Sequence, residues 1–257
     1  MRMVMNEKKY AEALINGDLA VRKQGTVYSI GIVAKYYKAA GYKGKMLEDI
    51  VKKFIQEKLP GTSESCSENW TKKAVKTAKN YPLYEIDEIV ITKPEMETIN
   101  SLHSNDIRNA TLRRLAFTLL CLAKYEAMRG TKDNWINVKS KHIFLVADIK
   151  GITKQRQDIM LYTLYSLGYI AFNQKIKGES IKALGIKDGD PEITVKNINE
   201  CGYIFEEKYN GKKFVRCAEC GIMVRATSGR TKRCPDCAVE RNRELARERM
   251  RKRRYAK

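Results

Sequence analysis

Four cysteines toward the C-terminal end have the spacing of a metal site. Two residues separate Cys217 from Cys220 and Cys234 from Cys237, and thirteen residues lie between the two pairs. A two-residue spacer lets both thiolates of a pair turn onto one ion, and two such pairs complete a tetrahedral all-sulfur shell. Iron in a rubredoxin-like site is the alternative, but the short basic loop between the pairs favours zinc. We therefore expect one structural zinc ion without catalytic activity, because four thiolates leave no open coordination position.

The other three cysteines are expected to be free thiols. Seven cysteines in all, an odd number, do not form the pattern of a secreted disulfide framework. We expect Cys66 and Cys121 to be buried, and Cys201 to lie outside the complete metal shell. The sequence has no apolar run long enough to span a membrane, and its start lacks the features of a secretory signal. These features predict a cytoplasmic, nucleoid-associated protein that does not bind membranes.

Positive charge is concentrated at the same end of the chain. The 257 residues carry a net charge of +20, and residues 212–257 hold sixteen basic and five acidic residues, a net charge of +11. Such an excess favours a polyanionic partner and makes association salt-dependent. We expect nucleic acid as the partner, with DNA favoured over RNA. The expected contacts in this region are Arg225, Arg230, Lys232, Arg233, Arg241, Arg243, Arg247, Arg249, Arg251, Lys252, Arg253 and Arg254.

The basic tail, residues 238–257, has the spacing of a helix. Its glutamates recur every four residues with arginines three and four positions away, so i,i+4 ion pairs are expected. Leu245 and Met250 are its larger apolar residues, so the tail can bury little by itself. We expect a helical or disordered segment that frays at its end and orders on nucleic acid. The tail should bind nucleic acid without regard to base sequence. The alternative is a solvated tail that keeps the protein soluble.

Helices with clear stop signals make up the first part of the chain. Residues 1–82 are expected to form an N-terminal helical domain, with helices that end at Gly17, at Gly41 and before Pro60. The polar loop "GTSESCS" and a further helix, "ENWTKKAVKTAKN", follow. After an extended connector, Thr92 and Glu95 have the spacing of a capping box.

The middle of the chain, residues 83–200, alternates helices with short strands. A long helix should end at Gly130, a shorter one near Gly151, and a third, capped by Thr153, at Gly168. The runs "YIAFNQKI" and "EITVKNI" read as strands, and "YIFEEKYNGKKFVRC" reads as a hairpin around Asn210-Gly211 within a zinc ribbon of residues 201–237. The predicted fold class is therefore mainly α (α+β).

The order of long helix, short helix, third helix ending in "SLGYI" and then strands resembles a winged helix-turn-helix domain over residues 104–200. The resemblance implies that the start of the third helix faces the major groove and that a wing follows. The residues so implicated are Lys154, Gln155, Arg156, Gln157, Lys175 and Lys177. Ile159, Leu161, Leu164 and Leu167 should face inward. Two alternatives stay open: a solvated helix start, and a winged helix that binds only proteins.

The whole-chain organisation resembles uncharacterised proteins of bacterial phages and mobile elements that end in a four-cysteine ribbon with a basic tail. That resemblance implies a DNA-transacting role. We expect a non-enzymatic DNA-binding protein with a part in transcription regulation or DNA replication, because no catalytic motif is present. One alternative is an interaction adaptor or phage-encoded inhibitor that acts on a host nucleoprotein. A primase or nuclease accessory is the third, and the oligomeric state stays open.

Overall fold

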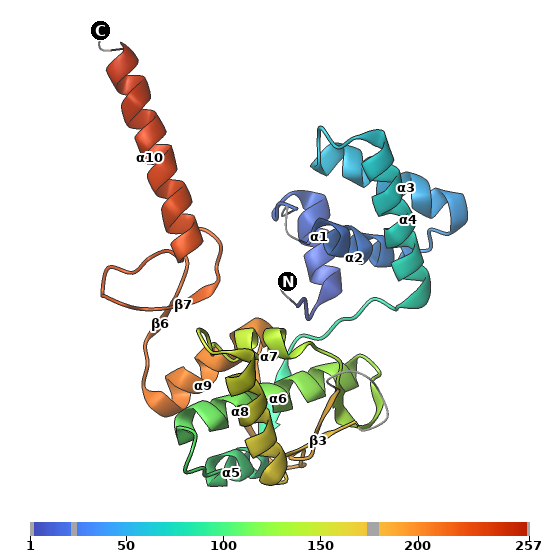
Figure 1. Cartoon of the computed structure of the whole chain (residues 1–257). Coiled ribbons are helices and arrows are strands. Elements are labelled where there is room, and N and C mark those ends of the chain that lie inside the picture. The colour runs from blue at the N-terminus through green and yellow to red at the C-terminus, as the bar shows by residue number, and fades with distance from the viewer. Residues whose placement is uncertain (1–2, 22–24, 174–179, 256–257) are drawn as a thin grey trace. The chain divides into compact units, whose positions relative to one another are not determined.

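The computed structural model is mainly helical, with small two- and three-stranded sheets. It describes residues 3–21, 25–173 and 180–255. This confirms the predicted mainly α (α+β) class. The described chain divides into two units (Figure 1). The first comprises Met1–Val90 with Tyr125–Thr131 and Lys196–Ile198, and the second comprises the remainder.

Four amphipathic helices of the first unit pack around one apolar core within the described residues. They are α1 (Glu7–Asn16), α2 (Thr26–Ala39), α3 (Gly44–Lys58) and α4 (Glu64–Asn80). The predicted stop at Gly17 is confirmed, since this residue caps α1 with a φ of 88°. Leu14, Ile30 and Val51 are fully buried in the core that the helices share.

The start of α4 differs from the prediction. The helix begins at Glu64, because the Ser63 hydroxyl caps it and accepts a hydrogen bond from the Cys66 backbone N–H at 3.4 Å. The polar loop is therefore shorter than expected. Cys66 lies on the first helical turn and is exposed, so its predicted burial was wrong, whereas Cys121 is buried as predicted.

A buried ion pair joins α1 to α2. The Lys35 ammonium contacts the Glu7 carboxylate, and the side chains are 5% and 1% exposed. The same carboxylate accepts a hydrogen bond from the Tyr84 backbone N–H at 3.1 Å, and the ammonium lies 4.8 Å from the centre of the Tyr84 ring. Burial lowers the pKa of Lys35, while Glu7 opposes that shift. Each charge depends on the other for compensation inside the core.

The elements of the second unit follow β1 (Ile89–Thr92), which pairs with β5 (Pro191–Val195). Its helices are α5 (Lys93–Ser101), α6 (Asn109–Met128), α7 (Ser140–Val146), α8 (Lys154–Ser166), α9 (Cys201–Asn210) and α10 (Pro235–Tyr255). The end of α6 belongs to the first unit.

Two predicted helix caps occur in this unit. The Glu95 side of the expected capping box forms, since the Thr92 N–H donates to the Glu95 carboxylate at 2.7 Å. Thr153 caps α8 as expected and accepts a hydrogen bond from the Arg156 backbone N–H.

A three-stranded antiparallel sheet contacts α8 through its strand β3. Its order is β2-β4-β3, from β2 (Trp135–Ile136), β4 (Ile181–Ala183) and β3 (Ile170–Phe172). Trp135 pairs with Lys182, and Ile170 pairs with Ala183. The sequence order is thus helix α6, strand β2, helices α7 and α8, then strands β3 and β4. The sequence pattern predicts β3 but neither β2 nor the central strand β4.

Two predicted element boundaries in this unit were wrong. Helix α7 ends at Val146, well before Gly151, and Asp148 adopts a φ of 52° in the turn that follows. The predicted hairpin around Asn210-Gly211 is instead the end of helix α9, with Gly211 as its left-handed cap. An Asn-Gly pair suits either a hairpin turn or a helix end. Burial decides in favour of the helix, because Cys201 and Phe205 lie on one helical face in the core.

Candidate metal centre and nucleic-acid interface

The four cysteines of the predicted motif lie together in the second unit. The sulfur atoms of Cys217, Cys220, Cys234 and Cys237 are all within 4.8 Å of one another, and those of Cys220 and Cys234 are 3.8 Å apart. Tetrahedral zinc with bonds of about 2.3 Å would hold its sulfur ligands about 3.8 Å apart. The cluster therefore has room for one metal ion and could bind it with four sulfur ligands.

The first cysteine pair forms the loop of a β-hairpin. Strands β6 (Phe214–Arg216) and β7 (Met223–Arg225) pair antiparallel on either side of it. The Cys217 N–H donates to the Ile222 carbonyl at 2.8 Å, and the Gly221 N–H donates to the Cys217 carbonyl at 2.8 Å. Gly221 has a φ of 67°, a conformation that side-chain-bearing residues rarely adopt. The hairpin thus turns both thiols of this pair toward one point.

The second cysteine pair lies at the start of α10. Cys234 precedes Pro235, which occupies the first helical position, and Cys237 lies in the first turn. The Cys237 N–H donates to the Cys234 sulfur at 3.4 Å. A backbone hydrogen bond from Ala218 to the Lys232 carbonyl, at 2.9 Å, joins this segment to the hairpin loop. The helix therefore begins inside the metal site, three residues before the tail predicted from the sequence.

Local interactions act differently on the thiols of the cluster and favour the thiolate at Cys217. Burial raises the pKa of Cys217, but backbone N–H groups of Cys234, Cys220 and Glu219 donate to its sulfur and bring its pKa down to about 6. Hydrogen bonding to Cys234 raises the pKa of Cys237. A thiol with a pKa near 6 is mostly thiolate at neutral pH, and the thiolate is the form that binds metals.

Contacts with α9 attach the hairpin to the second unit. The Arg216 guanidinium lies 3.2 Å from the Glu200 carboxylate, and the rings of Tyr203 and Phe214 are 5.0 Å apart. Glu206, which is buried on α9, pairs with Arg114 of α6 at 2.6 Å and also contacts Lys212. These contacts position the hairpin, which carries the first cysteine pair, against α9.

Most of the predicted nucleic-acid contacts in this region are exposed cations. Arg233 pairs with Glu219 at 2.8 Å, and Arg241 and Arg243 form i,i+3 pairs with Glu244 and Glu240. In the described part of the chain, no ion pair involves the exposed side chains of Arg225, Arg230, Lys232, Arg247, Arg249 and Arg251. Lys252, Arg253 and Arg254 extend α10, but their side chains lie outside the described part.

The predicted contacts at the start of α8 are more constrained. Lys154 lies 2.8 Å from Asp158, and the Arg156 guanidinium donates to the Asp106 carbonyl at 3.0 Å. Gln155 is exposed and Gln157 is half-buried. The predicted wing residues Lys175 and Lys177 lie outside the described residues.

The inward face predicted for α8 is partly wrong. Leu161 and Leu164 are buried, but Ile159 and Leu167 are 40% and 43% exposed. Only one side of α8 packs against the unit. Ile159 and Leu167, the first and last residues of the predicted apolar set, lie on its other side. An exposed aromatic row, which the sequence analysis missed, lies there: Tyr165 is 6.0 Å from Tyr162 and 5.4 Å from Phe172, measured between ring centres. The sequence signal for this row was the spacing of Tyr162 and Tyr165, which are three residues apart on a predicted helix.

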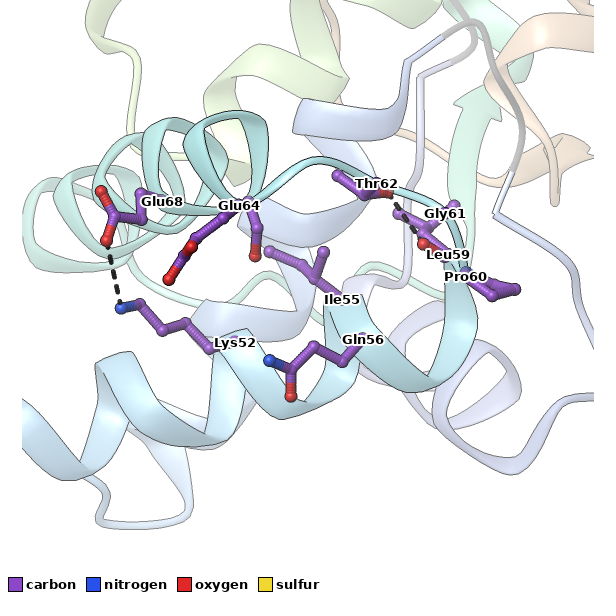
Figure 2. Close-up of a pocket in the computed structure, with 10 residues that line it drawn as sticks. Lys52, Ile55, Gln56, Leu59, Pro60, Gly61, Thr62, Glu64 and Glu68 are labelled. Atoms are coloured by element: carbon purple, nitrogen blue, oxygen red, sulfur yellow. Dashed lines mark hydrogen bonds and ion pairs between the residues drawn. The ribbon is translucent and has the colours of Figure 1, made fainter.

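A pocket of 310 Å³ lies in the first unit between α3 and α4 (Figure 2). Lys52 and Glu68 form an ion pair of 3.8 Å at one end of it, and Thr62 donates to the Leu59 carbonyl at the other. The lining holds no cysteine or histidine. This combination of residues points to no particular chemistry.

None of the helices within the described ranges is both long and apolar enough to cross a bilayer. Comparison with protein-family models, curated proteins and solved structures returns no match. The functional conclusions below therefore rest on the geometry and charge of this chain.

Proposed function

We propose that this chain is a non-enzymatic nucleic-acid-binding protein that prefers DNA, with a regulatory or replication-associated role. The observation that carries the proposal is the set of exposed cations along the hairpin and α10 that form no ion pair among the described side chains. Arg225 ends β7 and Arg230 lies between β7 and Cys234, and Arg247, Arg249 and Arg251 continue along the helix. Phosphate groups compensate such cations without the burial that a protein partner would require.

We propose zinc as the ion that the four cysteines hold. Zinc takes four thiolates in closed tetrahedral sites, and the sulfur separations are compatible with that shell. Four thiolates around one divalent ion carry a net charge of about −2, which the surrounding basic residues offset. The ion would fix the hairpin loop against the first turn of α10, and so hold both sets of cations in one module.

The second unit supports a winged-helix interpretation. Its order α6-β2-α7-α8-β3-β4 places three helices before strands β3 and β4, with the additional strand β2 after the first helix, and β2, β4 and β3 form one antiparallel sheet. We assign α8 a secondary part in DNA binding, because Lys154 and Arg156 already have protein partners. Gln155, which is exposed at its start, could approach a groove.

The experiment compares two triple variants that lose the same charge. Arg247, Arg249 and Arg251 of α10 are changed to Gln in one, and the exposed Lys72, Lys73 and Lys76 of α4 in the other. Fluorescence anisotropy measures the Kd of each for labelled duplex DNA, single-stranded DNA and RNA. The proposal expects the α10 variant to lose at least about tenfold in duplex affinity and the α4 variant to lose little. Equal losses, or no duplex binding by the unmodified chain, would contradict it.

The exposed aromatic row favours a second candidate function, that of a protein-binding adaptor. Tyr162 is 64% and Tyr165 is 44% exposed, and aromatic residues of this kind anchor protein interfaces. Changing both tyrosines to Ser separates the two functions. The adaptor function expects loss of a co-purifying protein with unchanged duplex affinity, and loss of duplex affinity alone would argue against it.

A further inference from the structure

Helix α10 has faces of different chemical character. Glu240, Glu244 and Glu248 recur every four residues and form one acidic stripe along the helix. Asn242, Ala246 and Arg249 follow i, i+4, i+7 spacing and therefore also share a face. At 3.6 residues per turn, this second face lies nearly opposite the acidic stripe. The two faces thus offer opposite environments to a polyanion.

Three arginines occupy the flanks between these two faces, and Arg251 lies within the acidic stripe. Arg243 and Arg247 lie on one flank and Arg241 on the other, as the helical period dictates. The ion pairs of Arg241 with Glu244 and of Arg243 with Glu240 are consistent with this order around the helix. Positive charge therefore lies on both sides of the face that holds Asn242, Ala246 and Arg249.

No part of the described chain covers this helix beyond its first turn. From Val239 to Arg251 every side chain is exposed except Leu245, which is half-buried. The metal cluster holds the start of the helix, because Cys237 lies in the first turn. A helix fixed at one end and open on every side can enter a groove without first displacing protein contacts.

The geometry points to the major groove of duplex DNA as the binding site for α10, with Asn242, Ala246 and Arg249 toward the base edges. This inference rests on the proposed nucleic-acid-binding function and adds sequence recognition to it. The groove is about 12 Å wide and admits a helix of about 10–12 Å diameter, with phosphates along both sides. The flanking arginines then meet phosphates, and the glutamate stripe faces away from them.

The side chains on the inner face are of the types that read bases directly. An Asn amide can form two hydrogen bonds with adenine, an Arg guanidinium can form two with guanine, and an Ala methyl can contact the methyl of thymine. From its sequence alone, the basic tail is expected to bind DNA without regard to base sequence. The separate acidic and base-reading faces of α10 lead us to infer base-selective binding instead.

Other nucleic acids fit the helix less well. The major groove of A-form RNA is too deep and narrow for a helix to read. Single strands are held on aromatic platforms, and the sequence from Pro235 to Met250 contains no aromatic residue. B-form duplex DNA is therefore the substrate class that α10 fits.

The test is selection of bound sequences from a random duplex library by the full zinc-loaded chain, followed by Kd measurements on the enriched duplex and on a scrambled one. Arg249→Lys keeps the charge but loses the two-bonded contact with guanine. Glu244→Gln on the acidic stripe is the control.

The inference expects Arg249→Lys and Asn242→Ser each to reduce the preference for the enriched duplex about tenfold, with affinity for the scrambled duplex nearly unchanged. Glu244→Gln should leave the preference intact. Zinc content and circular dichroism confirm that each variant is folded.

Three outcomes would overturn the inference. Duplex binding without an enriched sequence would leave the proposed function standing and remove selective readout by α10. If Gln155→Ala abolishes the preference for the enriched duplex and Arg249→Lys does not, base readout belongs to α8. Absence of binding to any nucleic acid would reject the proposed function together with the inference.

Discussion

The sulfur of Cys217 is the most strongly prepared atom of the metal cluster. Three backbone N–H groups donate to it and lower its pKa to about 6, against the opposing effect of burial. The turn that places these donors depends on Gly221, with its φ of 67°. The lowered pKa favours the thiolate form of Cys217, which is the form that binds metals.

Replacing Cys220 with Ser should abolish stable metal binding. Loss of one of four thiolates opens the shell and removes folding energy that the metal supplies to the hairpin and the first turn of α10. Metal analysis of purified protein should fall from about one zinc per chain to well below that. Cys66→Ser is the control, since this exposed thiol lies on α4 in the first unit. Full zinc content in Cys220→Ser, or equal loss in both variants, would contradict the assignment.

Replacing Glu7 with Gln should destabilise the first unit by about 3 kcal/mol. The substitution leaves the buried Lys35 ammonium without its counter-charge. Urea unfolding measures the change, with Trp70 of α4 as a fluorescent probe packed beside the core of this unit. Glu48→Gln, at an exposed position of α3, should change stability by less than about 0.5 kcal/mol. Similar effects of the two substitutions would show that the ion pair does not stabilise the core.

At the scale of elements, the approach of α9 to the end of α7 leaves no room for a side chain. A Cβ at Gly202 would lie 2.4 Å from the carbonyl carbon of Ala147 and 2.5 Å from its oxygen. Both are backbone atoms, so relief requires that one element move. This contact holds the helix that leads into the metal hairpin, and it explains why a glycine occurs inside α9.

Gly202→Ala should therefore destabilise the second unit by about 1–3 kcal/mol, the usual cost of overpacking. Gly229→Ala is a suitable control, because nothing lies within 4 Å of the Cβ it would add. Thermal unfolding followed by circular dichroism compares the two variants with the unmodified chain. An unchanged Tm for Gly202→Ala would mean that α7 and α9 are not packed so closely.

Local signals were sufficient for some elements and residues and insufficient for others. The end of α1 at Gly17, the Thr153 cap of α8 and the clustering of the four cysteines follow from spacings within a few residues, and all were predictable. Strand β4 was not, because its three residues become a strand through pairing with β2 and β3. The bond between Arg156 and Asp106 spans fifty residues, and no local pattern indicates it. The Asn210-Gly211 pair fits two structures, and only burial of α9 distinguishes them.

At the scale of the whole molecule, charge and core formation are separated along the chain. Residues 1–211 build the apolar cores and carry +9 of the net charge of +20, whereas residues 212–257 carry +11 and, among their described side chains, bury few. A charge excess of that density on one cysteine-bearing hairpin and one exposed helix repels itself unless a polyanion compensates it. The distribution assigns stability to the first part of the chain and the proposed nucleic-acid contact to the second.

The most direct test of this assignment is the salt dependence of duplex DNA binding by the full chain and by a chain truncated after Ala238. The truncated chain keeps all four cysteines, so a zinc content of about one per chain verifies that the metal module remains. Each phosphate contact contributes about 0.9 to the slope of log K against log salt concentration. We predict weaker binding and a slope shallower by at least about 3 for the truncated chain. Equal affinity and slope in the two chains would contradict the central claim that the basic residues of α10 bind phosphate.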